Sequence, residues 1–188
     1  MNRNLSTKQI TEIAILLAIA VVFELIAMFL PKMPQGGSFS LSMLPIFIIA
    51  FRQGPKIGII AGVTYGLLDL MLNGFILWHP MSFFLDYVIA FGLLGVSGFI
   101  FKINKNSLTL FITGIIIGST LRFFSHFLAG ILLFKESLVE NYPDMPIALG
   151  SIIYNMTYML PSMVITVIVG AIIYLTLKTQ LLESNQAL

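Results

Sequence analysis

Long apolar segments, separated by short polar turns, dominate this chain and limit it to folds that lie in a membrane. Of its 188 residues, 58% are hydrophobic and only 10% are charged, and the mean hydropathy is +1.00. A water-soluble domain has about 25% charged residues, so this chain has too little polar surface to cover itself in water. The sequence therefore predicts an all-α integral membrane protein, with one transmembrane domain over residues 1–188.

Six apolar segments are expected to form transmembrane helices. They cover residues 6–30, 39–51, 57–72, 81–101, 108–134 and 147–177. The second is shorter than the roughly 20 residues of a straight span, so we expect a short or tilted helix after the Pro/Gly-rich turn. The first is too long for a signal peptide, carries Glu24 and lacks a small-residue cleavage site.

The basic residues predict the orientation of these helices. Most lie near the termini or in the second and fourth loops: Arg3, Lys8, Arg52, Lys56, Lys102, Lys105 and Lys178. The other loops contain Lys32 and Lys135, with three acidic residues following the latter. Because positive loops stay in the cytoplasm, both termini are predicted to be cytoplasmic, in a multi-pass protein of the cell membrane.

Four residues at the end of the fifth segment form the most informative pattern. Arg122, His126, Gly130 and Phe134 are four residues apart, so a helix places them on one stripe. A cation inside a membrane-depth segment is costly unless it is paired or hydrated, and it marks a candidate functional site.

The predicted orientation brings further polar residues to the level of this stripe. Asp86 and Tyr87 lie in the outer half of the fourth segment, and Ser151, Tyr154 and Asn155 in the outer half of the sixth. The inner halves are almost purely apolar, whereas a channel needs polar groups along its whole path. The pattern favours a cup that captures a small molecule from outside.

The residue types in this cup suit a flat, partly cationic heterocycle. Asp86 can meet a positive charge, aromatic rings attract a cation, and Asn155 both donates and accepts. Structural alternatives remain for several residues: an Asp86–Arg122 ion pair, a buried His126, plain packing of Phe134, and interfacial anchoring by Tyr154 and Tyr158. Glu24 and Asp69 are expected to support helix ends or loops.

Several functional classes are disfavoured. The chain has no cysteine and no clustered basic patch that would indicate nucleic-acid binding. It shows no nucleophile–base motif, metal-ligand cluster or phosphate-binding glycine loop, so we expect neither an enzyme nor a cofactor. Ala14 and Ala18 give the first segment a small-residue side, which suits packing within the protein or against a partner helix.

Four stretches resemble a known family: MPQGGSFSLSMLPIFIIAFRQGPKIGIIAG, HPMSFFLDYVIAFGLLGVSG, GSTLRFFSHFLAGILLF and SIIYNMTYMLPS. Together they are similar to the thiamine-specific substrate-binding (S) component of energy-coupling factor transporters, the YuaJ/ThiT family. The resemblance implies six helices, a vitamin site near the extracellular face, and three partners: a transmembrane coupling protein and two cytoplasmic ATPases. It also implies that the chain itself is not an ATPase.

The resemblance implies a role for individual residues. The substrate site would comprise Asp86, Tyr87, Arg122, His126, Gly130, Phe134, Ser151, Tyr154 and Asn155, with Gln35 and Phe39 from the first outer loop. Ala14 and Ala18 correspond to the alanine motif that docks the coupling protein. Arg122, the deepest of its stripe, is expected to hold Asp86 and the floor of the site rather than a cationic vitamin.

Some positions depart from the family pattern. Asp86 stands where some members have Glu, Phe134 where some have Trp, and Gly150 where a tyrosine is found. These differences bear on affinity more than on substrate class, and they leave open a pyrimidine precursor of thiamine as the ligand. An S component for another vitamin, such as riboflavin or biotin, is a separate alternative. A small intramembrane enzyme and a transporter that works alone are the alternatives from other classes.

Overall fold

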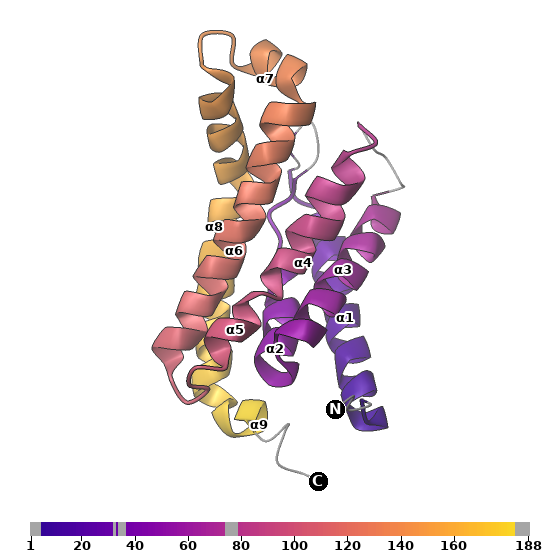
Figure 1. Cartoon of the computed structure of the whole chain (residues 1–188), viewed down its shortest axis with the longest axis vertical. Coiled ribbons are helices and arrows are strands. Elements are labelled where there is room, and N and C mark those ends of the chain that lie inside the picture. The colour runs from indigo at the N-terminus through magenta and orange to yellow at the C-terminus, as the bar shows by residue number, and fades with distance from the viewer. Residues whose placement is uncertain (1–4, 32, 34–36, 74–78, 183–188) are drawn as a thin grey trace.

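The computed structural model describes residues 5–31, 33, 37–73 and 79–182, and nearly all of them lie in helices that run along the long axis of the molecule (Figure 1). The elements in chain order are α1 (Thr7–Ala27), α2 (Met43–Gln53), α3 (Pro55–Leu72), the π-helix η1 (Phe83–Ile89), α4 (Ala90–Leu94), α5 (Ser97–Phe101), α6 (Leu108–Leu133), α7 (Lys135–Asn141), α8 (Ile147–Thr176) and α9 (Lys178–Leu182). The all-helical prediction is therefore confirmed.

Five helical stretches are long and apolar enough to cross a membrane: α1, α3, α6, α8 and the continuous stretch Phe83–Phe101. They coincide with five of the six predicted segments. The remaining segment forms α2, which has only 11 residues. A short helix was expected there, and whether it counts as a sixth span stays a prediction.

Local sequence explains where two of these helices begin. The Ser6 hydroxyl accepts from the Gln9 backbone N–H at 3.3 Å, and the Gln9 side chain accepts from the Ser6 N–H at 3.0 Å. This reciprocal cap satisfies N–H groups that have no partner within α1. Gly54 turns the chain between α2 and α3 with φ of 88°, and Pro55 then occupies the first position of α3.

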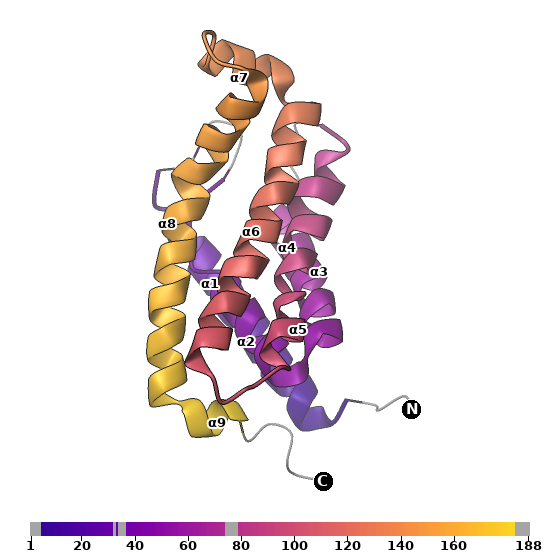
Figure 2. The same ribbon diagram turned by 60° about the vertical axis from the view of Figure 1, so that its left-hand side comes forward.

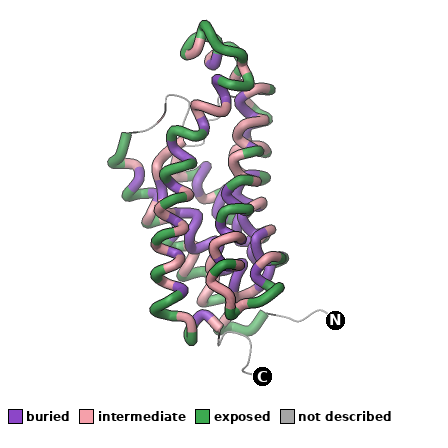
Figure 3. Tube along the Cα trace, turned by 90° about the vertical axis from the view of Figure 1, so that its left-hand side faces the viewer, coloured by how far each residue is buried: buried purple, intermediate pink, exposed green. Residues whose placement is uncertain are grey.

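The short helix α2 lies in the centre of the bundle, which explains why almost all its residues are apolar. Eight of its 11 residues are buried. Its Phe51 ring packs edge-on against Phe101 and Phe111, with ring centroids 5.4 and 5.1 Å apart, and Tyr174 of α8 adjoins the same cluster. Buried residues line the inner sides of the helices, and exposed ones follow their outer sides (Figure 3).

Most basic residues gather at one end of the molecule. α1 begins and α9 ends there (Figure 1). Lys56, in the first turn of α3, and Lys102, in the turn after α5, lie at the same end. Arg52 binds Glu12 of α1 through two nitrogens and the Gln180 carbonyl through a third. Lys105 donates to the Arg52 carbonyl at 3.3 Å, and its burial lowers the pKa of this ammonium. That this end faces the cytoplasm remains a prediction.

Glycines let α3 approach the η1–α4 stretch closely. A Cβ atom built on Gly62 would lie 2.2 Å from the Phe91 carbonyl oxygen, and one on Gly66 would lie 2.5 Å from the Tyr87 carbonyl oxygen. Contacts this short with backbone cannot be relieved by moving a side chain. The absence of side chains at these two positions therefore sets the distance between α3 and the helix that carries Asp86.

The Gly62→Ala variant should be destabilised by roughly 1–3 kcal/mol, the usual cost of overpacking. The measurement is the thermal unfolding midpoint in detergent micelles. Thr64→Ala, at an exposed position of the same helix, is the matched control and should leave the midpoint nearly unchanged. Equal midpoints for the two variants would contradict the close packing.

Candidate functional site

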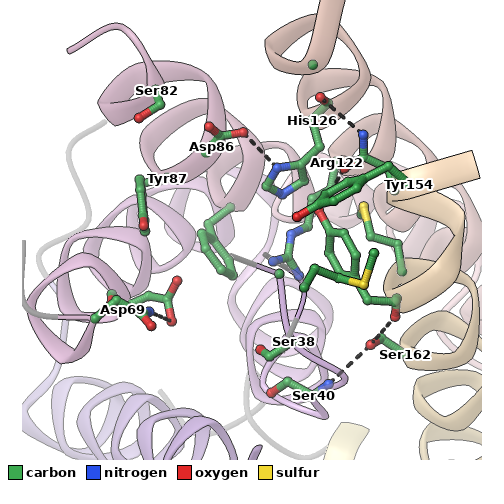
Figure 4. A pocket seen from close by; sticks show the side chains of 18 of the residues that line it. Ser38, Ser40, Asp69, Ser82, Asp86, Tyr87, Arg122, His126, Tyr154 and Ser162 are labelled. Atoms are coloured by element: carbon green, nitrogen blue, oxygen red, sulfur yellow. Dashed lines mark hydrogen bonds and ion pairs between the residues drawn. The ribbon is translucent and has the colours of Figure 1, made fainter. Parts of the chain in front are cut away.

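A cavity of about 640 Å³ opens in the half of the bundle near α7, between α1, α3, η1, α6 and α8. Volumes of about 300–1,000 Å³ are typical of small-molecule sites. Its described lining includes eight residues predicted for the site: Asp86, Tyr87, Arg122, His126, Gly130, Phe134, Tyr154 and Asn155. Figure 4 shows side chains from these helices facing one another across the cavity.

Asp86 and His126 join two walls of the cavity. The His126 Nδ1 lies 2.9 Å from the Asp86 Oδ1, and both side chains are largely buried, 11% and 18% exposed (Figure 4). When Asp86 is ionised its carboxylate only accepts, and in that state Nδ1 is the donor of this hydrogen bond. The other ring nitrogen, Nε2, is buried without a hydrogen-bond partner among the described residues.

The π-helix η1 carries Asp86 and Tyr87. A π turn widens the helix and changes the direction of the side chains around it, and such turns are frequent at functional sites. The Ser125 hydroxyl donates to the Leu85 carbonyl at 2.6 Å and fixes η1 against α6 at this level. Asp86 therefore lies opposite His126, and Tyr87 also lines the cavity.

The expectation that Arg122 pairs with Asp86 is wrong for this structure. Asp86 is held instead by His126, which lies one turn further along α6 than Arg122. The Arg122 guanidinium carbon instead lies 4.1 Å from the centre of the Phe91 ring, a cation–π contact. Its Nε is buried and has no hydrogen-bond partner in the described chain.

On α8, Asn155 is held by its neighbours. Its amide donates to the Ser151 carbonyl at 2.9 Å and accepts from the Tyr158 hydroxyl at 2.8 Å. Tyr154 also lines the cavity, with its ring centroid 6.2 Å from that of Tyr158. Tyr158 is buried in the wall rather than anchored at a membrane surface.

Ser151 holds α8 against α6 and does not line the cavity. It is fully buried, and its hydroxyl donates to the Phe127 carbonyl at 3.0 Å. A Cβ atom built on Gly130 would lie 2.2 Å from the Ser151 oxygen. Gly130 and Ser151 thus form a close contact between the two helices at the edge of the site.

The segment after α1 closes another side of the cavity. The Ser38 hydroxyl donates to Glu24 of α1 at 2.8 Å. The Ser40 backbone N–H donates to the Ser162 hydroxyl of α8 at 3.1 Å (Figure 4). Glu24 supports this loop as expected. Phe39 is not among the residues that line the cavity, and Gln35 lies outside the described residues.

Two acidic residues of the cavity wall were assigned only a supporting role from the sequence. Glu24 and Asp69 are 4% and 8% exposed, and both line the cavity. The signal that could have placed them there is the one that singled out Arg122, an ionisable residue inside an apolar helix. Other lining residues without a sequence signal are Ser38, Ser40, Phe91 and Ser162.

The described lining is acidic overall. It carries three carboxyl groups, from Glu24, Asp69 and Asp86, against one guanidinium, from Arg122. Aromatic rings from Tyr87, Phe91, Phe134, Tyr154 and Tyr158 surround these groups. Within the described ranges, no group of three or more His, Cys, Asp or Glu side chains is placed to hold a metal ion. Carboxylates and aromatic faces together favour a flat cationic ligand.

Known proteins resemble this chain along most of its length. Residues 10–182 match the family described as "Thiamine transporter protein (Thia_YuaJ)". The protein "Thiamine transporter ThiT" of Bacillus subtilis (strain 168) is 34% identical over 196 aligned positions, covering 100% of both chains. A protein of the same name from Lacticaseibacillus paracasei is 30% identical over 61% of this chain and 64% of its own.

A solved structure shares the fold. The ThiT structure from Listeria monocytogenes superimposes with a TM-score of 0.79 at 26% identity, covering 93% of this chain and 97% of that one. The five membrane-length helices are consistent with this multi-pass architecture. With a family match over residues 10–182 and a full-length relative at 34% identity, this chain belongs to the thiamine transporter (Thia_YuaJ) family of membrane proteins.

Proposed function

We propose that this protein is the thiamine-binding S component of an ATP-driven energy-coupling factor transporter, and that it captures thiamine from the extracellular side. The observation that carries the proposal is the acidic, aromatic-lined cavity in one half of a membrane bundle. Its relatives' name supports thiamine as the ligand. ATP hydrolysis is assigned to partner subunits.

The proposal assigns the cavity walls to different parts of the vitamin. The positively charged ring of thiamine is attracted by Asp86, with Glu24 and Asp69 adding to the negative potential of the cavity. The aromatic side chains of Phe134 and Tyr154 supply faces against which flat rings can stack. His126 holds Asp86 in position through the 2.9 Å contact.

Replacing Asp86 by Asn should weaken thiamine binding by about 10- to 100-fold, the usual range for a hydrogen-bonded or charged contact. The Asn oxygen can still accept from His126, so the substitution removes mainly the negative charge. Binding is measured by isothermal titration of the purified protein. Asp144→Asn, at an exposed position near α7, is the control; equal affinities for both variants would exclude a charge contact and favour a neutral vitamin.

Purified protein in vesicles should bind thiamine without accumulating it. Accumulation should require the coupling protein, both ATPase subunits and ATP, because the sequence contains no phosphate-binding glycine loop of its own. The measurement is uptake of labelled thiamine into vesicles with and without the partners. Uptake by the lone protein would show a transporter that works alone, and turnover of thiamine would show an enzyme.

The partner surface is proposed to include Ala14 and Ala18. Both are exposed on α1, on the side turned away from the bundle, and only 17% of the α1 membrane window is buried. Small side chains there would let a partner helix approach closely.

The Ala18→Trp variant should therefore reduce assembly with the coupling protein while thiamine affinity stays unchanged. Co-purification with the partner subunits measures assembly, and titration measures affinity. Ile116→Trp, on the exposed face of α6, is the matched control for a bulky lipid-facing residue. Normal assembly of the Ala18 variant would place the docking surface elsewhere.

A further inference from the structure

A second hollow lies at the opposite end of the molecule from the ligand cavity. It is a groove of about 650 Å³ between α1, α2 and the α8–α9 corner. Figure 2 shows α9 at that end, beside the end of α8. The walls are mainly aliphatic side chains: Ile15, Leu16, Ile48, Ile173, Leu177 and Leu181. The thiamine proposal assigns no role to this groove.

The mouth of the groove is polar and carries positive charge. Lys8 lines it and is exposed, and its side-chain ammonium has no hydrogen bond or ion pair within the described part of the chain. Glu12 also lines it, but Arg52 binds both oxygens of that carboxylate and neutralises it. The charge left at the mouth is therefore that of the Lys8 ammonium, next to the Thr7 hydroxyl.

The position of the groove relative to the bilayer follows from the surrounding residues. Lys56, Lys102, Lys105 and Lys178 lie at the same end, and such cations gather where a membrane protein meets the headgroups. The helices α1 and α8 are both of membrane length. Lys8 therefore lies at the level of the headgroups, and the aliphatic walls of the groove lie deeper, in the hydrocarbon layer. If the groove were empty there, its walls would lose dispersion contacts.

We propose that this groove binds one anionic diacyl phospholipid, with its phosphate at Lys8 and an acyl chain along Ile15, Ile48 and Ile173. Basic pockets between transmembrane helices at the cytoplasmic surface are suited to anionic headgroups. The bilayer supplies such a lipid at high local concentration, so no further component is needed to fill the groove. Ala14 and Ala18 are exposed on α1 and are not among the residues that line the groove.

The test compares lipid retention by native mass spectrometry. Purified protein is equilibrated with mixed micelles that contain phosphatidylglycerol and phosphatidylcholine in equal amounts. The wild type should keep one phosphatidylglycerol in preference to phosphatidylcholine. The Lys8→Gln variant should lose that preference by about fivefold, the effect of one lysine near a charged membrane surface. Lys56→Gln, an exposed lysine at the same end but outside the groove, should keep it.

A second variant tests the apolar part of the groove. Ile15→Trp fills the space beside Ile48 and should lower retention of both lipids, whereas Ile172→Trp, exposed on α8 outside the groove, should not. Helix content and the unfolding midpoint of each variant verify that it is folded. Any one of three results would overturn the proposal. The Lys8 and Lys56 variants could lose the preference for phosphatidylglycerol equally, the wild type could retain both lipids equally, or Ile15→Trp could leave lipid retention unchanged.

Discussion

Polar and charged side chains at membrane depth have to find partners inside the protein, because hydrocarbon offers none. In this bundle they do so in two ways. Ser125, Ser151 and Ser162 bind backbone carbonyls and thereby join or brace helices. The ionisable groups instead surround one cavity, where Asp86 is held by His126 and Arg122 lies on the Phe91 ring. The same requirement thus shapes both the packing and the site.

The serine contacts also determine how the site is assembled. Ser125 fixes η1 on α6, and Ser151 fixes α8 on α6. The helix α6 is therefore the common support of three walls, and its own stripe of Arg122, His126 and Gly130 forms one of them. Substitutions of Ser125 or Ser151 should therefore shift the walls of the cavity relative to one another, although these two hydroxyls are not themselves among the residues that line it.

Much of the fold followed from the sequence, because membrane helices are marked by long apolar segments. The five spans and the short α2 lie close to the predicted segments, and eight of the eleven residues predicted for the site line one cavity. The partner of Asp86 could not be predicted, since it depends on the π-helical register of η1 and on the Ser125 contact. Glu24 and Asp69 did carry a sequence signal, as ionisable residues inside apolar helices, but the direction in which they face depends on the rotation of α1 and α3 in the packed bundle.

The backbone of Gly37 lies against the Tyr158 ring. It has φ of 88°, and a Cβ atom there would come within 2.8 Å of the ring. Tyr158 in turn donates to Asn155, whose amide is bound to Ser151. The loop can therefore approach α8 this closely only because residue 37 has no side chain. Any side chain at this position would displace the Tyr158 ring, and with it the hydrogen-bonded residues Asn155 and Ser151 of α8.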